Sequence, residues 1–210
     1  MDAPTFEGSS VVSCGTLRPE VSLLREEGFL DADRVLFTAP GLHEWPGKLE
    51  EQLSRRIAEA RETSDRVIVL YGQRCFVDFD APQRDVDALV DEQGGAISRV
   101  EAGNCVDMLA DESLRQEIAG EDKVYWLTPG WVANWKFIFK DWDAGLANET
   151  FPQNKKAVLL DAVGFYQKTI EENPELILEF SDFMKIPLEP HPVSLDRLRD
   201  LLSQQLHDHE

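Results

Sequence analysis

Three cysteines are the residues of this sequence whose type and placement point most clearly to chemistry. Cys14 lies in VVSCGTLRPEV, Cys75 ends VIVLYGQRC, and Cys105 ends AISRVEAGNC. Each follows an apolar, strand-like run and has a glycine close by. If the three runs are neighbouring parallel strands, their carboxyl ends meet at one edge of a sheet, and we expect the three thiols to converge there.

Three converging thiols predict a site for a metal. Thiolates repel one another unless a cation compensates them, and both zinc and iron–sulfur clusters are held by cysteine. We therefore expect Cys14, Cys75 and Cys105 to bind zinc or an iron–sulfur cluster as cofactor. Three cysteines leave one position for His43, a carboxylate, water or substrate. The alternative is that the cysteines are small apolar core residues.

Three further side chains are candidates for catalytic roles at this edge. His43, in GLHEWP, follows a predicted strand and is expected to act as a fourth ligand or a base, or to bind a backbone carbonyl in a turn. Arg18 and Arg74 lie close to the first two cysteines in the chain. They are the cations expected to orient an anionic substrate, unless they form surface ion pairs in an acidic protein.

The segment LTPGW lies at the end of a predicted strand, in the same topological place as the cysteine loops, so Thr128 and Trp131 are expected to wall a cofactor or substrate pocket. An apolar stripe of the following helix explains Trp131 equally well. The glycine-containing segments YGQRC and EAGNC lack the spacings GxGxxG and GxxxxGK[ST], and no GxSxG occurs. Nucleotide binding and a serine-hydrolase elbow are therefore not indicated.

Strands and helices alternate along the chain, which predicts an α/β fold with a mainly parallel sheet of about five strands covered by helices, in a Rossmann-like three-layer arrangement. The predicted strands are Val11–Cys14, Arg34–Thr38, Arg66–Tyr71, Ala96–Val100 and Lys123–Leu127. The length of 210 residues favours one domain with its core over 9–142. The stretch 151–206 is expected to be a mainly helical extension, with one edge strand at Ile186–Glu189.

The formal net charge of −19, from 40 acidic and 21 basic residues, argues against a nucleic-acid partner and against an anionic membrane, because both require a basic surface. The first residues lack the basic start and apolar run of a secretory signal. No apolar segment approaches the roughly 20 residues of a membrane span. We expect a cytoplasmic protein whose cysteines stay reduced. Its oligomeric state is not readable from the sequence.

Five segments, in this order, resemble a prokaryotic family known as domain of unknown function 1638: CGTLRPE, GLHEWPGKL, YGQRC, GNCVDML and YWLTPGW. The resemblance implies that Cys14, Cys75, Cys105 and His43 are recurring site residues. It supplies no established reaction. Some members are associated with corrinoid-dependent methyl transfer, which implies a methyltransferase or corrinoid protein as partner and one-carbon chemistry as a role. Many relatives carry the middle cysteine closer to the tyrosine–glycine pair, whereas Cys75 lies three residues after Gly72.

Three functional hypotheses follow. The first is a metal-binding protein with the three cysteines as ligands. If this protein is an enzyme, it acts on a small anionic or one-carbon substrate. The second is a metal-free thiol enzyme or methyl acceptor in which one thiolate is the nucleophile. The third is an accessory protein of a methyltransferase complex with cysteines buried in its core. We favour the first.

Overall fold

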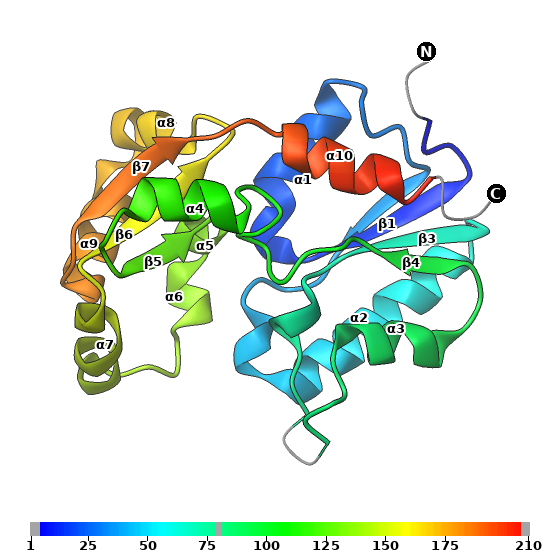
Figure 1. The fold of residues 1–210 in the computed structure, drawn as a ribbon, viewed down its shortest axis with the longest axis horizontal. Coiled ribbons are helices and arrows are strands. Elements are labelled where there is room, and N and C mark those ends of the chain that lie inside the picture. Colours follow the sequence, from blue (N-terminus) through cyan, green and yellow to red (C-terminus); the bar gives the residue numbers. More distant parts are fainter. Residues whose placement is uncertain (1–4, 79–80, 207–210) are drawn as a thin grey trace.

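The computed structural model describes residues 5–78 and 81–206, and within them seven strands form two parallel sheets (Figure 1). The first sheet has the order β2-β1-β3-β4, and the second has the order β5-β6-β7. The strands of the first sheet are β1 (Ser9–Ser13), β2 (Arg34–Phe37), β3 (Arg66–Leu70) and β4 (Ile97–Arg99). Those of the second are β5 (Val124–Leu127), β6 (Lys156–Asp161) and β7 (Leu188–Pro192).

Helices connect the strands in the manner that parallel pairing requires. They are α1 (Arg18–Glu26), α2 (Pro46–Arg61), α3 (Val86–Gln93), α4 (Glu112–Ala119), α5 (Pro129–Ala133), α6 (Trp135–Ile138), α7 (Ala144–Thr150), α8 (Phe165–Glu172), α9 (Pro174–Met184) and α10 (Asp196–Gln204). Short 3-10 turns lie at η1 (Gly15–Leu17), η2 (Leu42–Glu44), η3 (Gln73–Cys75) and η4 (Phe151–Gln153). The predicted α/β class is confirmed.

The two faces of the first sheet are buried in different cores because successive strand residues point to opposite faces. On β1, Val11 packs into a core that also receives Leu24 of α1 and Leu198 of α10. Its neighbour Val12 packs into a second core with Leu53 of α2 and other helix residues. The first core also contains side chains of β6, so it joins the two sheets.

After β7 the chain returns toward the first sheet, where α10 lies near α1 (Figure 1). Residues Leu198 and Leu202 of α10 are completely buried in the core they share with α1 and β6. The last helix therefore ties the two sheets together. No helix in the part of the chain that the structure describes is long and apolar enough to cross a membrane.

The strands differ from the sequence prediction in number and grouping. All five predicted strands are present, but the fifth, β5, starts a second sheet. The stretch 151–206, expected to be mainly helical, also supplies β6 and β7, the latter close to the predicted edge strand Ile186–Glu189. Between β4 and the second sheet, residues 105–109 form turns, and α4 begins at Glu112.

Candidate thiol site at the carboxyl edge of the first sheet

The three cysteines follow three strands that are consecutive in the order of the first sheet. Cys14 comes directly after β1, Cys75 is the last residue of η3 after β3, and Cys105 lies in the loop after β4. The chain proceeds from β1 outward to β2 and then returns to the other side of β1 with β3. The carboxyl ends of β1 and β3 are thus the point of strand-order reversal at which parallel α/β sheets bind ligands.

A close backbone contact holds the loops of Cys75 and Cys105 together. A Cβ atom added to Gly72 would lie 2.2 Å from the Asn104 Cα and 2.4 Å from its nitrogen, so only glycine fits. The Gln73 and Arg74 N–H groups donate to the carbonyls of Ala102 and Gly103 at 2.9 and 3.0 Å. The glycine of YGQRC is therefore what lets the two cysteine loops pack against each other.

The thiols lie close enough to influence one another's ionisation. Burial and the charge of Cys14 raise the pKa of Cys105 to about 12, against hydrogen bonds from the Thr16 and Trp131 side chains. Burial, followed by the charges of Cys105 and Cys14, raises the pKa of Cys75 still further above its usual range. The Cys14 sulfur lies 3.1 Å from the Thr16 hydroxyl. Cys14 thus disfavours ionisation of both other thiols, and Cys105 disfavours that of Cys75, so the three belong to one electrostatic cluster.

A cavity of about 430 Å³ borders this cluster. Its walls include five of the residues expected from the sequence: His43, Arg74, Cys75, Cys105 and Trp131. The other lining residues are Asn104, Val106, Arg115, Tyr125 and Trp126. The cavity lies between the carboxyl edge of the first sheet and strand β5 of the second, so both sheets contribute to its walls. Cys14 does not line the cavity and is buried, with 8% of its surface exposed.

His43 lies on η2 at the cavity wall and is exposed. Its ring centroid is 5.2 Å from that of Trp131, and its Nε2 atom is 3.3 Å from a carboxylate oxygen of Glu44. The hydrogen bond from His43 lowers the pKa of Glu44. The imidazole is thus oriented by a carboxylate on one side and an indole on the other.

Arg18 and Thr128 occupy other places than the cavity wall. The Arg18 guanidinium lies 4.0 Å from the centre of the Phe37 ring, a cation–π contact at the start of α1. Thr128 is completely buried, and its hydroxyl donates to the carbonyl of Thr16 at 3.0 Å. A Cβ on Gly130 would lie 2.2 Å from that carbonyl oxygen. The LTPGW segment therefore braces the turn after Cys14.

Glu20 is a buried carboxyl beside the cluster that sequence reasoning did not single out. Neither carboxylate oxygen has a hydrogen-bond partner among the described residues, and the side chain is completely buried in the first turn of α1. Burial, and to a smaller extent the charge of Asp161, raises the pKa of Glu20 to about 8. The charge of Glu20 in turn disfavours ionisation of Cys105 and so raises its pKa.

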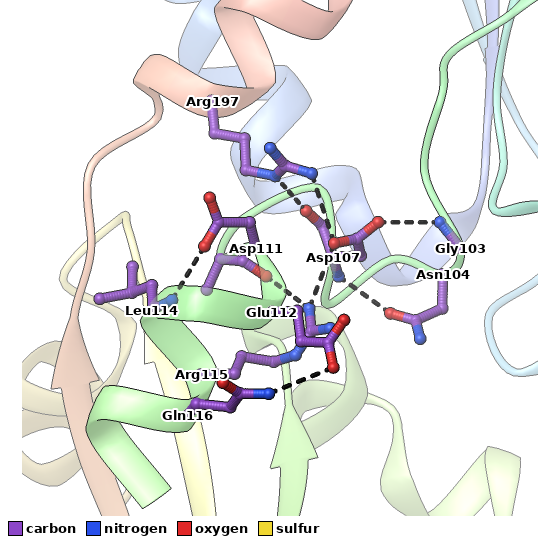
Figure 2. A network of polar contacts seen from close by, with 10 residues as sticks. Gly103, Asn104, Asp107, Asp111, Glu112, Leu114, Arg115, Gln116 and Arg197 are labelled. Atoms are coloured by element: carbon purple, nitrogen blue, oxygen red, sulfur yellow. Dashed lines mark hydrogen bonds and ion pairs between the residues drawn. The ribbon is translucent and has the colours of Figure 1, made fainter.

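Figure 2 shows the polar network that fixes the loop carrying Cys105. The Asp107 carboxylate accepts a hydrogen bond from the Gly103 N–H at 2.9 Å. It also pairs with Arg115 of α4 at 3.4 Å and with Arg197 of α10 at 3.3 Å. The Arg197 Nε donates to the Asp107 carbonyl at 2.5 Å. Asp107 therefore holds this loop to both neighbouring helices.

The chemistry of the candidate donor atoms fits a metal, whereas their arrangement in this structure does not. Three thiols and an imidazole are donors that zinc and iron–sulfur clusters accept. Within residues 5–78 and 81–206, however, no group of three or more His, Cys, Asp or Glu side chains is arranged so that it could hold a metal ion. A metal would require the cysteine side chains to turn toward a common point and to release their protons.

Arg115, Tyr125 and Trp126 are wall residues that sequence reasoning missed. Trp126 and Tyr125 lie within β5, which belongs to a second sheet that shares a core with the first. Arg115 lies in α4, next to the loop of Cys105. A basic residue shortly after the GNCVDML segment was the available signal, but one arginine in a helix has no diagnostic spacing.

Fold and site together define a parallel α/β protein of two sheets with a thiol cluster where strand order reverses. A family model described as "Protein of unknown function (DUF1638)" matches residues 37–202, and the chain belongs to this family. The resemblance inferred from the motifs is confirmed. His43, Cys75 and Cys105 lie within the matched residues, whereas Cys14 precedes them. No curated protein and no solved structure matches the chain.

Proposed function

We propose that this protein binds a soft metal ion or an iron–sulfur cluster through Cys14, Cys75 and Cys105. The observation that carries the proposal is the placement of three cysteines at the ends of three consecutive strands, two of them at the wall of a cavity. A bound cation would compensate the negative charge of the neighbouring thiolates. The proposal includes the cytoplasmic location in which such thiols stay reduced, with His43 as fourth ligand or base.

The raised thiol pKa values favour a metal over a free nucleophile. With the pKa of Cys105 raised to about 12 and that of Cys75 higher still, few thiolates form at neutral pH, and the thiolate is the reactive species. A cation would lower these pKa values by favouring the charged form. Metal-free thiol catalysis and methyl acceptance would need an activating group of this kind. An accessory role beside a methyltransferase or corrinoid protein is the alternative that leaves the cysteines structural.

The test is elemental analysis and visible absorption of protein purified without air. We expect about one zinc ion per chain, or iron with a broad charge-transfer band, in the wild type and its loss in Cys75→Ser and Cys105→Ser. Ala102→Ser is the matched control, because it places the same hydroxyl in the loop of Cys105 and keeps all three thiols. Its metal content should equal that of the wild type.

Two other results would contradict the proposal in different ways. Absence of metal from every sample, with all three thiols slow to alkylate, would leave the cysteines as core residues of an accessory protein. Absence of metal with one cysteine alkylated far faster than the others would instead support the thiol enzyme. Melting temperatures measured on the same samples show whether a serine variant lost metal because it failed to fold.

A further inference from the structure

The cavity beside the thiols differs in charge from the rest of the protein. The chain carries a formal net charge of −19, yet none of the ten described residues that line this cavity is acidic, and two of them, Arg74 and Arg115, are cations. A neighbouring cavity of about 340 Å³ shares both arginines but also contains Glu101, Asp107 and Glu112. The lining beside the thiols is therefore selectively positive.

Both arginines have N–H groups available to a ligand. The exposed Arg74 side chain makes no hydrogen bond or ion pair within the described residues; its backbone N–H donates to Gly103. Arg115 donates from Nη1 to the Ala110 carbonyl at 2.5 Å and pairs with Asp107 at 3.4 Å through the same atom. Within the described residues, these contacts leave the other guanidinium nitrogens of Arg115 free, while holding its side chain in place.

Aromatic side chains form the other walls. Trp126 and Tyr125 come from β5, and Trp131 comes from α5, where it is 6% exposed and lies against the His43 ring. Flat apolar walls favour a ligand with an apolar body, and guanidinium forks favour a planar or tetrahedral acid group. Positive charge and aromatic surface thus occur together in a cavity large enough for a small organic molecule.

We infer that this cavity binds a small organic anion, with its carboxylate or phosphate group held by Arg74 and Arg115 and its apolar body against Trp126 and Trp131. The inference rests on the proposed function, because the thiol cluster lies at the wall of the same cavity. It deepens that function by naming the class of molecule that reaches the thiols. The bound anion lies beside Cys75 and Cys105, where a metal on the thiols would meet it.

The test is a titration of the purified full chain with benzoate, inorganic phosphate and the neutral benzyl alcohol, followed by tryptophan fluorescence and calorimetry. We expect saturable binding of benzoate or phosphate at millimolar concentration or below, and none of benzyl alcohol. The stronger of the two anions identifies the acid group that the arginines prefer. No saturable binding of either anion would overturn the inference.

Three variants locate the binding. Arg74→Gln should weaken the preferred anion about tenfold, since one charge-assisted contact contributes roughly that much. Arg115→Lys keeps the positive charge but not the guanidinium fork and should weaken it by a smaller factor. Arg18→Gln is the matched control, an arginine near Cys14 that stacks on Phe37 away from the cavity. Equal affinity in Arg74→Gln and Arg18→Gln would overturn the inference.

Metal analysis of the same samples separates this inference from the proposed function. Anion binding that depends on Arg74 in metal-free protein would uphold the anion site and overturn the metal. Bound metal without any anion binding would uphold the metal site and overturn the anion site. Arg74→Gln itself should retain the metal content of the wild type, because Arg74 has no thiol or ligand role.

Discussion

The carboxyl edges of the two sheets use their polar side chains differently. At the second sheet, Asp161 ends β6 and its carboxylate accepts hydrogen bonds from the N–H groups of Val163, Phe165 and Tyr166 at 2.8–3.2 Å, which starts α8. Thr128, after β5, donates to a carbonyl of the first sheet's edge. At the first sheet, Cys75 and Cys105 instead face a cavity. At one edge the polar groups make structural contacts, whereas at the other two thiols line a cavity.

The largest expected effect comes from the close contact at the first edge. Gly72→Ala would place a Cβ 2.2 Å from the Asn104 backbone, so the two cysteine loops must separate, and we expect a loss of about 3 kcal/mol in the free energy of unfolding. Gly47→Ala is the control, because no described atom lies within 4 Å of its added Cβ. That substitution in α2 should be neutral or stabilise by about 0.5 kcal/mol. Urea unfolding of both variants measures these changes in stability. Equal stabilities of the two variants would contradict the close contact between Gly72 and Asn104.

Glu20 lies between the two edges and predicts a pH dependence. Because the pKa of Glu20 is raised from 4.5 to about 8 in the folded protein, the folded state keeps a proton that the unfolded chain releases above its own pKa. The contribution is therefore complete below the unfolded pKa and is lost as the pH rises toward 8. Between about pH 5.5 and 7 the stability should fall by about 2 kcal/mol.

Urea unfolding across this pH range, on wild type and Glu20→Gln, measures the effect. The glutamine variant should lose most of the slope, since an amide does not titrate. Glu26→Gln, at the exposed end of the same helix, is the control and should keep it. An unchanged slope in Glu20→Gln would show that another group carries the dependence.

The smallest effect compares one aspartate from each edge. Asp107→Ala removes the contacts to Gly103, Arg115 and Arg197 and should cost about 1.5 kcal/mol. Asp161→Ala removes the start of α8 and should cost about 1 kcal/mol. Only Asp107→Ala should speed alkylation of Cys105, because only that residue fixes the cysteine loop. Equal acceleration in both variants would mean that the two edges are not independent.

The sequence sufficed for the first sheet because its signals are local. RVIVLY has an uncharged, β-branched centre, and its first five residues form β3. Leu49, Leu53 and Ile57 occur at helical spacing, and all three are buried on α2. Placing cysteines after such strands required only the rule that parallel strands end at one edge. The strand order of the first sheet, in which β1, β3 and β4 are consecutive, then brings the cysteine-bearing ends together.

The second sheet and the cavity could not be predicted in the same way. KAVLLD, which forms β6, is a short apolar run that fits a buried helix as well as a strand. Without β6, nothing in the sequence separates β5 from the first sheet, so Trp126 has no reason to face the cysteines. Arg18 is the opposite case. Its proximity to Cys14 in the sequence predicts a place in the site, but in the structure its side chain stacks on Phe37 instead.

The contact between Arg197 of α10 and the loop that carries Cys105 also has a consequence for biosynthesis. Cys14 leaves the ribosome several seconds before Cys105 at ordinary rates of elongation, and Arg197, which holds Asp107, is made later still. The three thiols therefore reach their final arrangement only after α10 has emerged and packed. A cofactor delivered before that moment would meet a cysteine loop that Arg197 has not yet fixed.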